Sequence, residues 1–312
     1  MFFGGKGGVG KTTIANATAL QLSASATTLV VSTDPAHNVG HLWDTKVGDV
    51  PTAVRPGIDV LELDPARATQ EHLQQAGDTM RRMMPEHLHK EVKKHLHLAE
   101  HSPGTHEAAM LERIAILLED YGEKYDHIIF DTAPSGHTAR LMALPELMSA
   151  WTDGLLERRA KSEKFSDIVR GMSPTGKDRT VATAVDPVDR RNQELRSILL
   201  KRRRRFEQLR AVLTDATRCQ FHIVLTAERL PVLETDEFHA ELNANGVHVG
   251  ALIVNRRSPA DQGEFLASRR KYEDEALADL QRRLPKLDVI EIPLRAHDVG
   301  SPQALEEIAS FL

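Results

Sequence analysis

The stretch Gly5-Lys6-Gly7-Gly8-Val9-Gly10-Lys11-Thr12-Thr13 decides how this chain folds. It fits the pattern G-x-x-x-x-G-K-[ST], in which backbone N–H groups turn inward around phosphate oxygens and a Cβ would obstruct them. Three apolar residues precede it, and an Ala/Leu-rich segment from Thr12 to Leu22 follows. A strand, a glycine loop and a helix are therefore predicted, with the positive end of the helix facing a bound anion.

Two lysines of this loop have different predicted roles. Lys11 is expected to reach the β- and γ-phosphates of ATP, and the Thr12 hydroxyl is expected to ligate Mg²⁺ directly. Lys6 lies on the other side of the loop, where the phosphates of its own chain need no second lysine. It is predicted to act on a nucleotide of a facing copy, as in dimeric ATPases with a deviant Walker A loop. The predicted nucleotide-binding residues of the loop are Gly5, Lys6, Gly7, Gly8, Val9, Gly10, Lys11, Thr12 and Thr13.

A second motif, Thr33-Asp34-Pro35-Ala36-His37, follows an apolar run that starts at Thr28 and predicts a buried parallel strand. In an α/β sheet the carboxyl ends of the strands form the ligand edge, so Asp34 is placed to orient or deprotonate the attacking water. A second interpretation is that Asp34 caps a helix whose first residue is Pro35. Spacing alone leaves both interpretations open.

A third motif is the apolar run Ile128-Ile129-Phe130 ending in Asp131, followed by Thr132-Ala133-Pro134-Ser135-Gly136-His137-Thr138. This pattern predicts a buried strand that delivers Asp131 to the same edge, where it holds Mg²⁺ through water. The proline and glycine suit a loop that changes path when the γ-phosphate leaves. His137 has two interpretations, a switch residue or a capping or core histidine.

Together the three motifs resemble those of the arsenical-pump-driving (ArsA-like) and tail-anchored-protein-targeting ATPases, and the chain resembles a half-size member with one phosphate loop. The resemblance implies a P-loop NTPase fold and a catalytic role for Asp34 with Lys6 and Lys11. It also identifies two switch loops. Their residues in this sequence are Asp34, Pro35, His37, Asp131, Pro134, Gly136 and His137.

Three residues further along are assigned to the nucleoside by the same resemblance. Glu228 follows the apolar segment that begins at Phe221 and matches a family glutamate that reaches the nucleotide across the dimer. Asn255 matches an asparagine that hydrogen-bonds adenine, for which an amide has both donor and acceptor. Pro293 lies where the family packs the base. Ordinary turn chemistry is the alternative explanation for Asn255 and Pro293.

Composition limits the other classes of protein. The chain has 312 residues, 41% hydrophobic and 27% charged, with a formal net charge of −5, which fits a globular protein and gives no support to nucleic-acid binding. No apolar run approaches the ~20 residues of a spanning helix, and no signal peptide is evident, so a cytoplasmic location is predicted. Only three residues precede Gly4, which leaves open whether native residues come before Met1.

The strand pattern predicts an α/β domain over residues 1–312 with a doubly wound, mostly parallel sheet. Strands are expected to end near Thr33, Leu63, Asp131, Thr226, Asn255 and Ile292. Two strand-poor helical insertions, at about 66–120 and 146–212, are expected to pack together as one lobe. With a single phosphate loop, the chain is expected to pair with a copy of itself.

The predicted lobe carries patterns with two interpretations each. An apolar stripe in the first insertion and an apolar set in the second serve either as core or as a groove for an apolar client helix. The basic run from Lys201 to Arg205 is read as a solvated helix face, with a docking patch as the alternative. The stripe consists of Leu73, Met80, Met84, Leu88, Val92 and Leu96, and the second set of Met148, Trp151, Leu155, Leu156, Phe165, Ile168, Val169 and Met172.

Six histidines crowd residues 87–106, but no cysteine or carboxylate cage accompanies them. Cys219 is the single cysteine, too few for a three-thiolate metalloid site. The sequence therefore predicts a homodimeric Mg²⁺-dependent ATPase that opens and closes a helical lobe and handles a hydrophobic client or a membrane-embedded partner. The alternatives are the soluble subunit of an arsenite or antimonite efflux pump and a partitioning or assembly ATPase.

Overall fold

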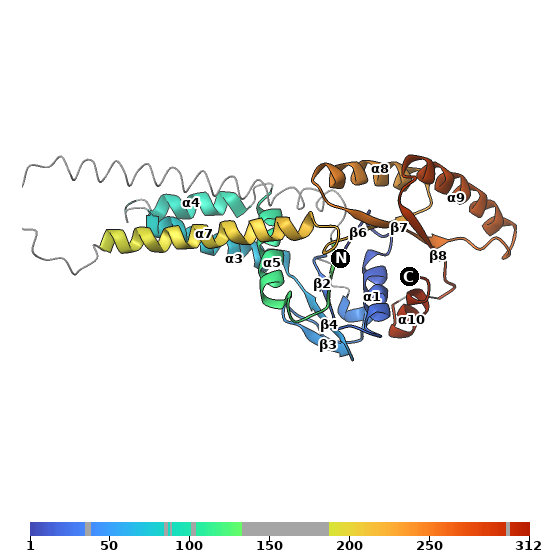
Figure 1. The fold of residues 1–312 in the computed structure, drawn as a ribbon, viewed down its shortest axis with the longest axis horizontal. Coiled ribbons are helices and arrows are strands. Elements are labelled where there is room, and N and C mark those ends of the chain that lie inside the picture. Colours follow the sequence, from blue (N-terminus) through green and yellow to red (C-terminus); the bar gives the residue numbers. More distant parts are fainter. Residues whose placement is uncertain (35–38, 84–86, 88, 101–103, 133–186, 298–299) are drawn as a thin grey trace, which may run out of the picture.

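The computed structural model describes residues 1–34, 39–83, 87, 89–100, 104–132, 187–297 and 300–312. Its centre is an eight-stranded sheet in the order β3-β4-β2-β5-β1-β6-β7-β8 (Figure 1). Neighbouring strands are parallel except β3 and β4, which are antiparallel. The strands are β1 (Phe2–Gly4), β2 (Thr28–Ser32), β3 (Thr52–Arg55), β4 (Ile58–Glu62), β5 (His127–Asp131), β6 (Phe221–Thr226), β7 (Val249–Arg257) and β8 (Asp288–Pro293).

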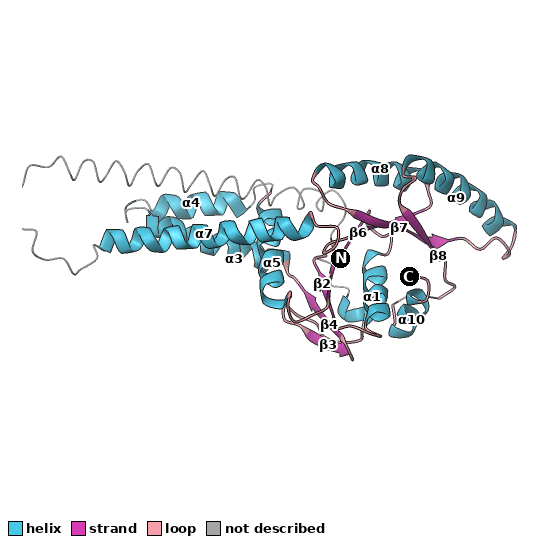
Figure 2. Ribbon diagram, viewed as in Figure 1, coloured by secondary structure: helices cyan, strands magenta, loops and turns pink. Residues whose placement is uncertain are grey.

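Helices cover both faces of this sheet (Figure 2). One apolar cluster joins α1, α2 and α10 to one face, and a second joins α5, α7, α8 and α9 to the other. The predicted doubly wound α/β fold is confirmed. The helices are α1 (Lys11–Leu22), α2 (Val39–Leu42), α3 (Pro65–Met83), α4 (His89–Glu100), α5 (Thr105–Tyr121), α7 (Pro187–Leu213), α8 (Arg229–Ala244), α9 (Glu264–Arg283) and α10 (Pro302–Ala309).

The central strands are buried on both sides, which explains their continuous apolar sequences. In β2, Leu29 and Val31 belong to one cluster and Val30 to the other. Successive side chains of a strand point to opposite faces, so both sets of neighbours must be apolar when both faces are covered. The predicted strand ends agree with the observed ends of β2, β4, β5, β6 and β8.

The short strand β1 lies in the middle of the sheet, between β5 and β6. The ring of Phe2 stacks on Phe130 of β5, with centroids 4.5 Å apart, and lies parallel to Phe221 of β6 at 6.3 Å. Stacked aromatic pairs add stabilisation beyond their buried area. These contacts fix the strand from which the glycine loop starts.

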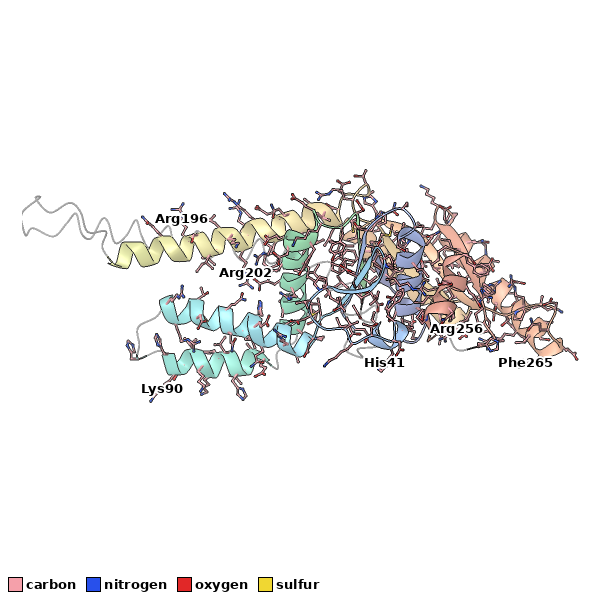
Figure 3. The ribbon with its side chains drawn as sticks, turned by 90° about the horizontal axis from the view of Figure 1, so that it is seen from below. His41, Lys90, Arg196, Arg202, Arg256 and Phe265 are labelled. Atoms are coloured by element: carbon pink, nitrogen blue, oxygen red, sulfur yellow. The ribbon has the colours of Figure 1, made fainter. Side chains whose placement is uncertain are left out.

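Helices α3, α4 and much of α7 extend away from the sheet (Figure 1). Figure 3 places Lys90 and Arg196 on this extension and Phe265 at the opposite end of the molecule. A charged cluster ties three of the helices together, because Glu112 of α5 accepts hydrogen bonds from His72 of α3 at 2.6 Å and from Arg202 of α7 at 3.0 Å. Burial raises the pKa of Glu112, but the bond to His72 and the charge of Arg202 lower it overall.

The basic run of α7 is only partly solvated, so the prediction of a solvated face for Lys201–Arg205 was partly wrong. Lys201 and Arg204 are exposed, but Arg202 bonds Glu112, and Arg205 pairs with Glu119 of α5 at 2.8 Å. The physical reason is that α7 packs against α5, which presents carboxylates to it. Periodicity along α7 alone does not reveal this partner.

The apolar stripe of the first insertion packs between helices where it is described. Val92 is buried, while Leu73, Met80 and Leu96 are half-buried. Met84 and Leu88 lie outside the described residues, as does the apolar set from Met148 to Met172. In the part of the chain that is described, no helix is long and apolar enough to cross a membrane.

Candidate nucleotide site

The glycine loop has the backbone geometry that its sequence predicts. Gly5, Gly8 and Gly10 have φ angles of 146°, 79° and 97°, a region that L side chains rarely adopt. A Cβ on Gly5 would overlap the Val224 carbonyl of β6, and a Cβ on Gly10 would overlap the side-chain amide of Asn255. Glycine is therefore required here both by conformation and by close approach.

Lys11 begins α1 and points back into the loop. Its side chain is buried, and its Nζ donates to the backbone carbonyl of Lys6 at 3.0 Å. Burial lowers the pKa of Lys11, while the nearby carboxylates of Asp131 and Asp34 raise it in part. An amine that is buried beneath a ring of backbone N–H groups is placed to meet phosphate oxygens.

Asp131 ends β5 at the bottom of the same site. It is completely buried, and neither carboxylate oxygen has a hydrogen-bond partner of good geometry among the described residues. Burial raises its pKa to about 7, although the hydroxyls of Thr12 and Ser32 and the charge of Lys11 oppose that shift. An unsatisfied buried carboxylate beside a threonine hydroxyl fits a hydrated Mg²⁺.

Asp34 follows β2 and lies close enough to influence both Lys11 and Asp131 electrostatically. The structure therefore brings the predicted residues Lys11, Thr12, Asp34 and Asp131 together at the carboxyl edge of three adjacent strands. The first amides of α2 are satisfied by another acid. Glu62 Oε1 accepts from the N–H groups of Val39 at 2.9 Å and Gly40 at 3.2 Å.

Several predicted switch residues lie outside the described residues. These are Pro35, His37, Pro134, Gly136 and His137. The two acids that begin the predicted switch loops, Asp34 and Asp131, are described. Their positions agree with the predicted edge of the sheet.

Lys6 and Glu228 are exposed, unlike Lys11. Lys6 is exposed, and its Nζ forms an ion pair with Glu234 of α8 at 2.7 Å. Glu228 is the residue before α8 and pairs with Arg269 of α9 at 3.0 Å. Both predicted residues are therefore accessible, and each contacts a charge on the C-terminal half of the chain.

Asn255 contacts the phosphate loop rather than open space. Its Nδ2 donates to the Val9 carbonyl at 2.8 Å, and its Oδ1 accepts from the Arg256 N–H at 2.9 Å. Each of these amide atoms can still make a second hydrogen bond. Pro293, at the end of β8, is in register with Arg257 of β7, so the two predicted nucleoside residues lie on neighbouring strands.

A buried arginine holds this region together and was not predicted from the sequence. The guanidinium of Arg257 is 2% exposed and bonds Glu273 and Asp274 of α9 and Glu291 of β8, at 3.0, 2.5 and 2.6 Å. Such a network is costly to break, because one lost partner leaves buried charges without compensation. The sequence Asn255-Arg256-Arg257 could have indicated this buried arginine, because charged residues there continue an apolar strand.

The crowd of histidines between residues 87 and 106, for which no metal site was predicted, is described only in part. Within the described residues, no group of three or more histidine, cysteine, aspartate or glutamate side chains could hold a metal ion. His72 bonds Glu112 and His106 lies 2.8 Å from the Thr69 hydroxyl, so these two histidines join α3 to α5.

A strand–glycine loop–helix unit with a buried lysine, a threonine and two acids at one edge of a parallel sheet defines a P-loop nucleotide hydrolase. The chain matches the model of the anion-transporting ATPase (ArsA ATPase) family over residues 1–312 and belongs to that family. Among its relatives, it is 30% identical over 314 residues to an arsenical pump-driving ATPase of Escherichia coli, a match of 98% of this chain and 48% of that protein. It therefore spans about half the length of that relative.

Other relatives are matched along nearly their whole length. The chain is 27% identical over 327 residues to the ATPase GET3 of Malassezia globosa, a match of 100% of this chain and 90% of that protein. It is 28% identical over 313 residues to a protein of Aquifex aeolicus whose name also refers to an arsenical pump-driving ATPase, with 98% of that protein covered. The chain is therefore similar both to pump-driving and to GET3 ATPases.

The raised pKa of Asp131 predicts a pH dependence for the nucleotide-free chain. Between about pH 4 and pH 7 the folded state keeps a proton that the unfolded state has released, so the free energy of unfolding falls as pH rises, by up to about 1.4 kcal/mol per pH unit. Asp131→Asn removes this component. Chemical denaturation at several pH values should show that the free energy of unfolding of the variant rises relative to that of the parent up to about pH 7.

Asp126→Asn is the matched control, because hydrogen bonds from Thr27 lower the pKa of Asp126. The Asp126 carboxyl is ionised in both the folded and the unfolded state above about pH 5. The free energy of unfolding of its variant should therefore differ from that of the parent by a constant amount in this range. A constant difference for Asp131→Asn as well would contradict the assignment of a buried, partly protonated carboxylate.

Proposed function

We propose that this ATPase acts as a Mg²⁺-dependent homodimer in which ATP hydrolysis opens and closes the helical lobe, and that it handles a hydrophobic client or targets membrane proteins. The observation that carries the proposal is the different exposure of the two loop lysines. Lys11 is buried and bonds the Lys6 carbonyl, whereas the Lys6 side chain is about half exposed and pairs with Glu234. Of these two lysines, only Lys6 has an exposed side chain that a second copy could reach.

The residues of the loop fit a triphosphate. The positive φ angles of its glycines let backbone N–H groups turn toward phosphate oxygens, and Lys11 would exchange the Lys6 carbonyl for those oxygens. Thr12 and Asp131 would hold Mg²⁺, the hydroxyl directly and the carboxylate through water. When bound, Mg²⁺ neutralises charge that develops on the phosphates. Its double charge also favours the ionised form of Asp131.

Asp34 is proposed as the residue that orients or deprotonates the attacking water. It follows β2, the strand next to β5, and is half-buried near Lys11 and Asp131. A general base must be within reach of the water and near the transferred group, and the carboxyl edge of the sheet meets both requirements. Glu62 supports it by fixing the start of α2, which follows the first switch loop.

Coupling to the lobe follows from chain connectivity. Helix α5 leads into β5 and Asp131, and α7 leads into β6 and Glu228. The cluster of His72, Glu112 and Arg202 ties both helices to α3. We propose that residues 66–120 and 146–212 move as one lobe within a single ATPase domain, because these contacts join helices of both insertions.

Lys6→Ala should leave nucleotide affinity within a few-fold of the parent and lower the rate of ATP hydrolysis by about 10³-fold, because a cation that neutralises the transition state is lost. Lys11→Ala should lose nucleotide binding itself. Affinity and turnover are measured separately for each variant. Lys271→Ala, which changes an exposed lysine on α9, is the charge-matched control. Equal losses of affinity and turnover in Lys6→Ala would place that lysine on its own nucleotide.

Asp34→Asn should bind ATP normally and slow single-turnover hydrolysis by about 10²-fold or more, since the amide cannot accept a proton from water. The variant should accumulate as an ATP-bound dimer, which size-exclusion chromatography with nucleotide can measure. Hydrolysis within a few-fold of the parent rate would favour the helix-cap interpretation instead.

The second candidate is the soluble subunit of an oxyanion pump, which the name of the Escherichia coli relative supports. Cys219 argues against an arsenite site. It is the only cysteine of the sequence, it is buried, and burial raises the pKa of its thiol. Thiolates are the soft ligands that such a site requires. Two thiols in a homodimer cannot supply three of them.

A hydrophobic helical peptide should therefore stimulate ATP turnover, whereas arsenite should not. Both are titrated into the parent and into Cys219→Ser while phosphate release is followed. Stimulation by arsenite that disappears in Cys219→Ser would establish the pump candidate. Stimulation by DNA or by lipid vesicles alone would support the third alternative, a partitioning or assembly ATPase.

A further inference from the structure

Lys6, the lysine proposed to act on a facing subunit, is already occupied within its own chain. Its Nζ lies 2.7 Å from Glu234 Oε1, although 228 residues separate the two along the sequence. Glu234 lies on α8, and Gly5, Lys6, Val224 and Glu234 line one small hollow between the loop and that helix. The close approach of Gly5 to the Val224 carbonyl holds the loop against β6, directly before α8.

We propose that Glu234 is a positioning residue that holds Lys6 in its own subunit until the nucleotide of a second copy displaces it. The proposal rests on the proposed function of Lys6 in trans. A carboxylate and a phosphate are both anionic acceptors for an ammonium group, so they compete for the same three donors. Lys6 reaches across only after it has left Glu234.

The strength of the pair suits a reversible contact. Both side chains are about half exposed, at 51% for Lys6 and 44% for Glu234, so solvent screens their attraction. The second oxygen of Glu234, Oε2, is buried without a hydrogen-bond partner among the described residues.

Because Glu234 pairs with Lys6, a second copy that reaches Lys6 also meets the face of α8 that carries Glu234. Leu230, one turn earlier on the same face, is 66% exposed, and Glu228 precedes the helix. A facing nucleotide therefore meets the negative charge of Glu234 as well as the positive charge of Lys6. While Lys6 and Glu234 are paired, their charges largely cancel. The attraction for phosphate develops when Lys6 turns away.

The test compares Glu234→Gln with the parent over a range of protein concentrations. Without the carboxylate, Lys6 is free for the second copy, so the protein concentration at half-maximal ATP turnover should fall about two- to fivefold. Glu237→Gln removes the same charge from an exposed position on the same helix and should leave that concentration unchanged. Thermal unfolding of both variants verifies that they fold as the parent does.

A double variant, Lys6→Ala with Glu234→Gln, separates the restraint from any structural role. If Glu234 acts through Lys6, its substitution has no effect on turnover in the Lys6→Ala background. The inference is overturned if the protein concentration at half-maximal turnover does not fall in Glu234→Gln. It is also overturned if that concentration falls equally with and without Lys6. A Lys6→Ala variant that hydrolyses ATP like the parent overturns the proposed function and this inference together, whereas loss of turnover in Lys6→Ala without a gain in Glu234→Gln overturns the inference alone.

Discussion

The completely buried carboxylate of Asp131, which has no hydrogen-bond partner of good geometry among the described residues, is the constraint on which the rest of the nucleotide site depends. Ionising Asp131 in that position costs free energy unless a cation lies nearby, and Lys11 alone lowers its pKa only in part. The hydroxyl of Thr12 and the buried ammonium group of Lys11 lie close to it and meet this need in part. The same charge balance explains why burial lowers the pKa of Lys11 while Asp131 and Asp34 oppose the effect.

The features that could be predicted from the sequence are those set by local chemistry. The left-handed conformations of Gly5, Gly8 and Gly10 follow from a pattern that only glycine satisfies, and the strands before Asp34 and Asp131 follow from continuous apolar runs in a sheet covered on both faces. Because ligands bind at the carboxyl ends of parallel strands, these residues could be predicted to lie at one edge of the sheet.

The features that sequence patterns missed are charge pairs between distant elements. Nothing near Lys6 in the sequence indicates Glu234, and nothing in the basic run of α7 indicates that Arg202 meets Glu112. The buried Arg257 is similar, because its partners come from α9 and β8. Long charged side chains select partners only after the helices have packed, so neither periodicity nor composition encodes the pairing. Asn255 shows the same limit, since its amide bonds the Val9 carbonyl across the sheet.

The position of β1 has a mechanical consequence. The strands on one side of it come from residues 28–131 and carry Asp34 and Asp131, whereas those on the other side come from residues 221–293 and carry the neighbours of Lys6, Glu228 and Asn255. In the described part of the chain, three residues of β1 form the seam between these two half-sheets, and the phosphate loop starts at its end. A small rotation of one half-sheet against the other would therefore displace the phosphate loop first. The loop would act as the hinge between the two half-sheets.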